Sequence, residues 1–173
     1  MAGPAVRKPW SDRTDIEKLE SQWKKVRSLR GKNQASAAVV RAATAAEIAA
    51  NIAIRSEFAR QSGLDKKTVD SFLLWANGLN GKMTHLVFPL VFNNVTGDAK
   101  YVELLVLAKN INQVRNRIVH SGVYASGAQL TSVCTDTKRF VEALLNKYHP
   151  GYELPAIEDE AESDASESDT SED

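Results

Sequence analysis

The chain contains few of the residues that build disulfides and metal centres. Its 173 residues include one cysteine, Cys134, and three histidines that are scattered along the sequence. A single cysteine excludes a disulfide within the chain, and neither residue type recurs at the short spacings of a metal site. We therefore predict no metal centre and no cofactor, and we expect Cys134 to be a small buried apolar group rather than a nucleophile.

Long apolar segments and aromatic side chains are also scarce. No run of about 18 apolar residues is present to span a membrane, and the first residues lack the charged-then-apolar order of a signal peptide. We therefore expect a cytoplasmic protein without a membrane partner. Aromatic residues make up 7% of the chain against 43% for all hydrophobic residues, and alanine is concentrated in one segment. This composition favours an all-α protein.

The net charge is zero, but the charge is unevenly distributed. Residues 158–173 hold nine of the 22 acidic residues and no Lys or Arg, so residues 1–157 have 13 acids against 22 bases, a net charge of +9. We predict a flexible arm over residues 1–12, a helical domain over residues 13–155, and a disordered acidic tail over residues 156–173. A basic domain suits a polyanion such as RNA if its charges are clustered.

Apolar residues recur every three or four positions through most of the domain, which is typical of amphipathic helices. Ser11 or Thr14 is expected to cap the first helix, which Gly31 ends. The apolar run at residues 86–92 has the composition of a strand, but Pro89 favours a short helix. The longer predicted helices cover about residues 14–30, 33–62, 65–76, 98–120 and 129–148, with a break at residues 77–81. The sequence therefore predicts a bundle of four to five helices.

One short segment contains the residues of a candidate catalytic site. Arg115, Asn116 and His120 lie near the end of the helix predicted at residues 98–120, and Ser121 and Gly122 follow, with Gly122 expected to end the helix. At about 100° per residue, Arg115 and His120 are about 140° apart around the helix axis. They can act together only if the Arg115 side chain swings round, if the last turn is distorted, or if a second protomer takes part.

The segment from Arg115 to Gly122 resembles the signature of the HEPN domains, small all-helical units whose active members are metal-independent ribonucleases. That signature is an arginine, four to six residues and then a histidine, commonly with a polar residue directly after the arginine, as Asn116 is here. The place of the motif near the end of the penultimate long helix is also similar. The resemblance covers about residues 33–148, and it implies that Arg115, Asn116 and His120 are catalytic.

The chemistry that the resemblance implies needs few protein groups, because RNA supplies its own nucleophile, the 2′-hydroxyl. A histidine can transfer the protons, and an arginine can hold the phosphate and stabilise the charge of the transition state. Asn116 can orient His120 or the phosphate. In the family, two protomers commonly pack with their motifs facing each other, so the resemblance implies a homodimer in which two His120 side chains share the acid and base roles.

Five further residues are candidate RNA contacts around this motif. Glu47 and Asn51 are four residues apart on one line of the helix predicted at residues 33–62, where they either face the cleft of His120 or form an exposed polar stripe. Some HEPN proteins have a tyrosine two residues after the histidine that a partner antitoxin modifies, but Gly122 occupies that position here. A neutralising protein partner therefore stays an open expectation. The five candidates are Glu47, Asn51, Arg117, Ser121 and Tyr124.

The sequence therefore predicts a metal-independent endoribonuclease with RNA as its substrate, as in a toxin or a defence effector. One alternative is a catalytically inactive HEPN-like module that binds RNA or a protein partner, and another is a structural helical adaptor. The motif itself also has a simpler interpretation, since cations near a helix C-terminus interact favourably with the helix dipole. The acidic tail is either a solubility segment or a tethered competitor of RNA.

Overall fold

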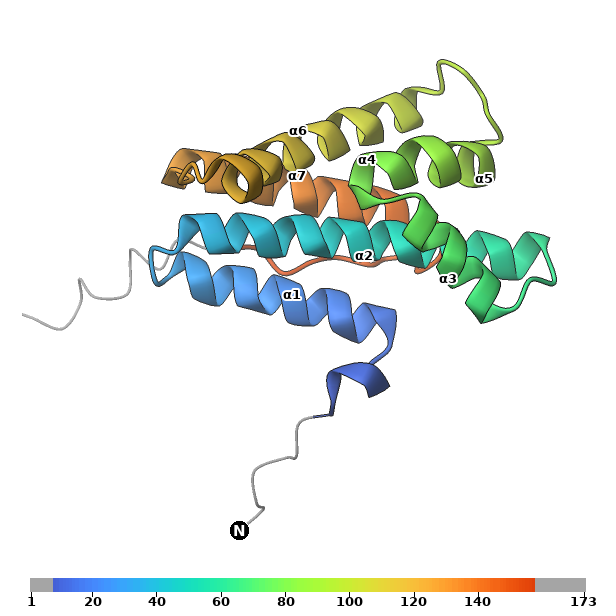
Figure 1. Ribbon diagram of the computed structural model, residues 1–173, viewed down its shortest axis with the longest axis horizontal. Coiled ribbons are helices and arrows are strands. Elements are labelled where there is room, and N and C mark those ends of the chain that lie inside the picture. The colour runs from blue at the N-terminus through green and yellow to red at the C-terminus, as the bar shows by residue number, and fades with distance from the viewer. Residues whose placement is uncertain (1–7, 158–173) are drawn as a thin grey trace, which may run out of the picture.

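The computed structural model describes residues 8–157, and all the regular secondary structure in this range is helical, as predicted (Figure 1). The predicted acidic tail from residue 158 and the first seven residues of the predicted arm lie outside the described residues. The elements are the 3-10 turn η1 (Trp10–Asp12), α1 (Asp15–Arg30), α2 (Ala35–Gln61), α3 (Lys66–Trp75), α4 (Gly78–Lys82), the π-helical turn η2 (Met83–Val87), α5 (Phe88–Phe92), α6 (Ala99–Ser121) and α7 (Gly127–Leu145).

Local capping interactions set several of the helix boundaries. The Thr14 hydroxyl accepts a hydrogen bond from the Glu17 backbone N–H at 3.1 Å, and the Glu17 carboxylate accepts one from the Thr14 N–H at 2.6 Å, which closes a capping box at the start of α1. Asp65 and Asp98 cap α3 and α6 with their carboxylates. At the other end of α6, Gly122 adopts the left-handed conformation with φ 64°, as its position in the sequence predicts.

The break predicted at residues 77–81 is much shorter in the structure. The chain leaves α3 at Ala76 and becomes helical again at Gly78. A side chain at Gly81 would approach the Ala76 carbonyl carbon to 3.3 Å, so glycine permits this close contact. The apolar run that follows is helical, with Pro89 in the first turn of α5, where its missing N–H is not needed. The prediction of a short helix here, and not a strand, is confirmed.

Helix α2 is the centre of the bundle, with α1 on one side, α6 on the other and α7 behind (Figure 1). Its many alanines let these helices approach closely, and most of these alanines are buried. By length and composition alone α2 could cross a membrane, but 61% of its most apolar window is buried by the rest of the bundle, as expected for a core helix. The largest fully buried side chains of the bundle are Trp23, Phe140, Leu19 and Ile54, the last of which belongs to α2 itself.

A buried carboxylate joins the end of α2 to the segment that follows α7. Glu57 is fully buried and accepts hydrogen bonds from the Tyr148 hydroxyl at 2.8 Å, Gln61 at 2.6 Å and Arg60 at 2.6 Å, and it pairs with Lys147 at 2.6 Å. Burial alone raises the pKa of Glu57, but these four donors outweigh burial and hold its pKa at about 2.

Candidate functional site

The predicted motif lies in the last two turns of α6, and these turns are regular. Every residue from Ala99 to Ser121 is α-helical, and the Gly122 N–H closes the helix by donating to the Arg117 carbonyl. The distorted last turn that could have brought Arg115 beside His120 is therefore not present.

The Arg115 side chain instead turns round the helix toward Asn116. Its Nη1 donates a hydrogen bond of 2.9 Å to Asn116 Oδ1. Asn116 and His120 are four residues apart, so they lie on the same face of α6. The guanidinium is thus drawn toward the side of the helix on which His120 lies. Because Asn116 uses its oxygen for Arg115, its amide N–H groups stay available as donors.

His120 is exposed, whereas Arg115 and Asn116 are half-buried. Within residues 8–157, the side chains of His120, Arg117 and Ser121 have no hydrogen-bond or ion-pair partner, so the imidazole, the guanidinium and the hydroxyl are open to a ligand. Three polar groups of different chemistry are therefore presented together at the end of one helix.

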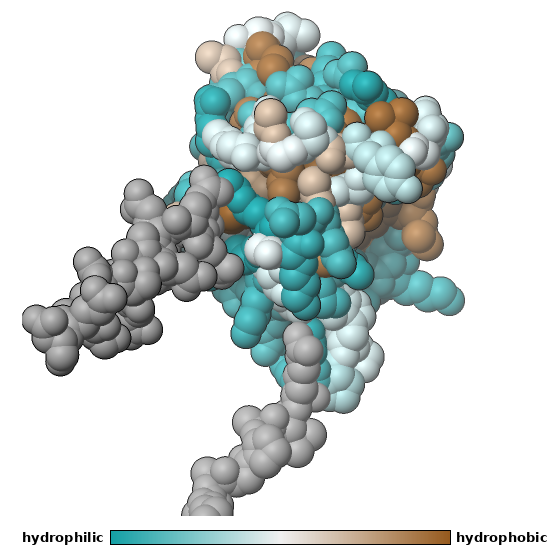
Figure 2. Space-filling model, turned by 90° about the vertical axis from the view of Figure 1, so that its left-hand side faces the viewer, coloured by the Kyte–Doolittle hydropathy of each residue, from teal (hydrophilic) through white to brown (hydrophobic). Residues whose placement is uncertain are grey.

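The loop after α6 fixes this end of the helix against the start of α2. The Ala125 N–H donates to the Ser36 hydroxyl at 2.9 Å, while Tyr124 is 88% exposed. Figure 2 faces this end of the bundle, where apolar residues are scattered among hydrophilic ones in the upper part, on the side of α6, and hydrophilic residues cover the lower part. Val119 and Val123 are also exposed, so His120 has exposed apolar side chains near it in the chain.

The structure does not join Glu47 or Asn51 to this motif by any contact among the described residues. Asn51 lines a pocket of about 300 Å³ with Arg55, Asp70 and Lys82. It is 15 residues beyond Ser36, or about 22 Å along the axis of α2. Glu47 is close to Lys82 of α4, whose pKa burial lowers and the charge of Glu47 raises.

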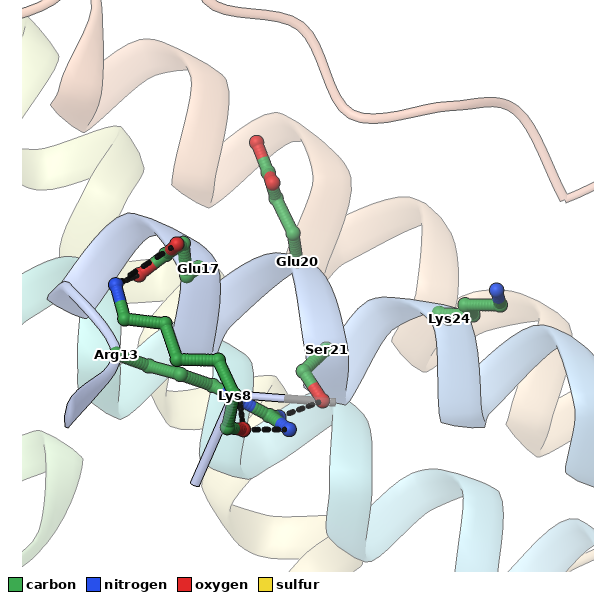
Figure 3. Close-up of a pocket in the computed structure, with 6 residues that line it drawn as sticks. All are labelled: Lys8, Arg13, Glu17, Glu20, Ser21 and Lys24. Atoms are coloured by element: carbon green, nitrogen blue, oxygen red, sulfur yellow. Dashed lines mark hydrogen bonds and ion pairs between the residues drawn. The ribbon is translucent and has the colours of Figure 1, made fainter. Parts of the chain in front are cut away.

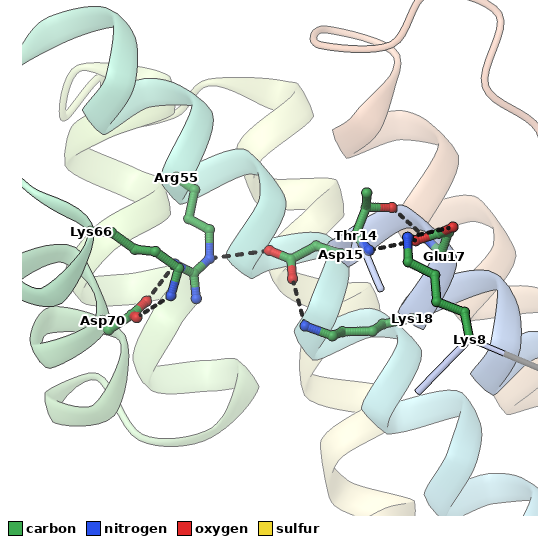
Figure 4. Close-up of polar contacts among 8 residues, drawn as sticks. All are labelled: Lys8, Thr14, Asp15, Glu17, Lys18, Arg55, Lys66 and Asp70. Atoms are coloured by element: carbon green, nitrogen blue, oxygen red, sulfur yellow. Dashed lines mark hydrogen bonds and ion pairs between the residues drawn. The ribbon is translucent and has the colours of Figure 1, made fainter. Parts of the chain in front are cut away.

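The residue four positions after Asn51 on α2, Arg55, instead belongs to an ion-pair network that connects three helices (Figure 4). Arg55 of α2 pairs with Asp15 of α1 at 3.2 Å and with Asp70 of α3, and Asp70 also pairs with Lys66 at 2.7 Å. This network holds α3 against the bundle at a different place from the motif.

Two side chains with reactive groups outside the motif, Lys82 and Cys134, are buried. Lys82 is only 6% exposed and donates to the Ala76 carbonyl at 3.4 Å. The sequence does not indicate this burial, because Lys82 follows a segment rich in Gly and Asn that is typical of an exposed turn. Cys134 is buried, as predicted, and burial raises the pKa of its thiol to about 11. Within residues 8–157, no three His, Cys, Asp or Glu side chains are grouped so that they could hold a metal ion.

Comparison with known proteins adds no relative: no family model, no curated protein and no solved structure matches the chain.

Proposed function

We propose that the protein is a metal-independent endoribonuclease of the HEPN type, with Arg115, Asn116 and His120 as its catalytic residues. The observation that carries the proposal is the hydrogen bond from Arg115 to Asn116, which brings the guanidinium toward the face of the exposed His120. A cation for the phosphate and a titratable group for the proton are thereby placed at one end of α6.

In the proposed reaction, the 2′-oxygen of RNA attacks the adjacent phosphorus while the bond from phosphorus to the 5′-oxygen breaks. His120 accepts the proton of the 2′-hydroxyl or gives a proton to the leaving 5′-oxygen. Arg115 stabilises the negative charge that builds on the phosphate oxygens, and the Asn116 amide donates to one of them. The products are a 2′,3′-cyclic phosphate and a 5′-hydroxyl.

One histidine cannot be acid and base in the same step, so the proposal includes a homodimer with two motifs in one shared cleft. The exposed Val119, Val123 and Tyr124 beside His120 support this arrangement, because a two-fold interface uses the same apolar patch of both protomers. Val119→Glu would place two carboxylates in that interface, so it is expected to lower dimer formation and RNA cleavage together. A monomer that cleaves RNA at the full rate would contradict the shared cleft.

The proposal is tested by RNA cleavage in EDTA with matched pairs of variants. His120→Ala and Arg115→Ala are each expected to lower the rate at least about a hundredfold, the usual contribution of a proton-transfer or oxyanion group. The controls are His85→Ala and Arg139→Ala, which remove an exposed histidine and an exposed arginine elsewhere on the bundle. Equal rates in all four variants would contradict the proposal, and binding without cleavage by the wild type would support an inactive RNA-binding module.

A further inference from the structure

The chain turns back after α7 and packs against the bundle as an extended segment. We call residues 151–157 the C-terminal arm. Its Leu154 is buried, donates its N–H to Glu142 at 2.9 Å and accepts a hydrogen bond from Lys138 through its carbonyl. The Trp23 indole N–H of α1 donates to the Pro155 carbonyl at 2.8 Å. Three side chains of the bundle therefore fix the course of the arm.

The arm ends beside the last turn of α1. Ala156 and Ile157 line a cavity of about 230 Å³ with Trp23, Arg30 and Cys134. In Figure 1 the red end of the described chain runs back along α2 toward the end of the bundle where α1 turns into α2. The last described residue, Ile157, therefore lies at this end of the molecule.

The same end has a group of positive charges without partners. Lys24, Arg27 and Lys32 line an open hollow of about 550 Å³ together with Ser28 and Gly31, and we call these five residues the α1 basic surface. All five are exposed, and none of the three cations has a hydrogen bond or an ion pair within residues 8–157. The sequence concentrates charge here, since residues 21–46 contain six Lys or Arg and no Asp or Glu.

The first half of α1 is different, because its lysine and the lysine that reaches it from the preceding segment are both paired. Lys18 pairs with Asp15 at 3.6 Å and Lys8 with Glu17 at 2.9 Å. Figure 3 shows the pair of Lys8 and Glu17, whereas Lys24 in the same view has no partner. The unpaired charge is thus confined to the part of α1 beside which the arm ends.

The end of the C-terminal arm, Ala156 and Ile157, is next to this surface. Arg27 is four residues after Trp23 and three before Arg30, so its side chain lies alongside the two α1 residues that line the cavity with the end of the arm. Lys24 lies three residues before Arg27 on the same side of the helix.

We propose that residues 158–173 bind the α1 basic surface of the same chain. The segment has nine carboxylates and no Lys or Arg, so its charge is complementary to that of Lys24, Arg27 and Lys32. A random coil of 16 residues spans about 22 Å, which reaches the α1 basic surface, whereas the far end of α2 is about 40 Å away. The tether gives the segment an effective concentration of about millimolar, and binding weakens with salt because exposed charges are screened beyond about 8 Å.

Zero-length carbodiimide cross-linking of the full chain tests the contact. At low salt, Lys24 and Lys32 are expected to form amide cross-links with residues 158–173 at least about tenfold more often than Lys67, an exposed lysine without an ion pair at the start of α3. Isotope-mixed chains separate links within a chain from links between chains. Equal cross-linking of Lys67, or links only between chains, would overturn the proposal.

A second measurement separates this contact from nucleic-acid binding and from the proposed catalysis. The probe is a deoxythymidine oligonucleotide, which has no 2′-hydroxyl to cleave. Replacing the nine acids of residues 158–173 by Asn and Gln is expected to raise its affinity at least about tenfold at low salt. Charge reversal at Lys24, Arg27 and Lys32 in the neutral-tail chain is expected to remove that gain. If the neutral tail leaves the affinity unchanged, the surface is free in the wild type and the proposal is wrong, whatever the outcome of the RNA cleavage assay.

Discussion

The buried carboxylate of Glu57 gives the most quantitative prediction about the fold. Its pKa is about 2 in the folded protein against an ordinary value of 4.5. Each pKa unit corresponds to about 1.4 kcal/mol, so the ionised carboxylate contributes about 3 kcal/mol to the free energy of unfolding. Because the folded pKa is the lower one, this contribution is complete above about pH 5 and is lost as the pH falls from 4.5 toward 2.

Glu57→Gln keeps the size of the side chain and removes its charge. At pH 7 the variant is expected to lose about 3 kcal/mol, or about 10 °C in Tm for a domain of this size. Lys147 and Arg60 are partly exposed and can rehydrate, so the lost charge interaction accounts for most of this cost. Urea unfolding followed by circular dichroism from pH 2.5 to 7 measures the difference between variant and wild type, which is expected to shrink steadily below pH 4.5.

The matched control is Glu103→Gln, which removes a carboxylate of an exposed pair with Arg139. Exposed pairs contribute at most about 1 kcal/mol, so this variant is expected to unfold almost like the wild type at every pH. Equal stability of Glu57→Gln and wild type at pH 7, or a difference between them that does not change with pH, would refute the reasoning.

Three further predictions concern single side chains. Gly122→Ala is expected to lose about 1 kcal/mol in urea unfolding because φ is 64°, whereas Gly63→Ala, where φ lies outside the left-handed region and the space is open, is expected to lose less; equal losses would contradict the left-handed cap. Lys82→Met is expected to raise the free energy of unfolding by about 1–2 kcal/mol, since it removes a buried ammonium that has one long hydrogen bond; a loss of stability in the same assay would contradict this. Cys134 is expected to react with a disulfide reagent at pH 8 at least about a hundredfold more slowly in the folded than in the unfolded protein, because burial raises its pKa from 9.0 to about 11. Equal rates in both states would show that the thiol is accessible.

The helices could be predicted because their boundaries depend on residues close together in the chain. Thr14 and Glu17, or Asp98 and the N–H three residues later, form caps that a sequence pattern reveals, and Gly122 marks a helix end in the same way. The break after Ala76 is shorter than predicted, because the chain becomes helical again at Gly78. There Gly81 lies close to the Ala76 backbone, a contact that the sequence pattern does not show.

Side-chain partners that are distant in sequence could not be predicted. Glu57 looks like an ordinary polar residue of a long helix, yet one of its partners, Tyr148, is 91 residues away. Glu47 and Asn51 were expected to lie on one line of α2, and the structure shows that the next residue on that line, Arg55, pairs with Asp15 and Asp70 of two other helices. The direction of the Arg115 side chain could not be predicted either. Helical spacing gives the angle between Arg115 and His120 around the helix axis, but not the side to which the guanidinium turns.

The identity of the RNA ends produced in EDTA tests the central claim most directly. The account predicts that wild-type protein leaves 2′,3′-cyclic phosphate and 5′-hydroxyl ends, that an RNA with one 2′-deoxynucleotide at the cleaved position resists cleavage there, and that His120→Ala leaves the RNA intact. Ends with a 5′-phosphate, cleavage at the 2′-deoxy position, or full activity without His120 would contradict it.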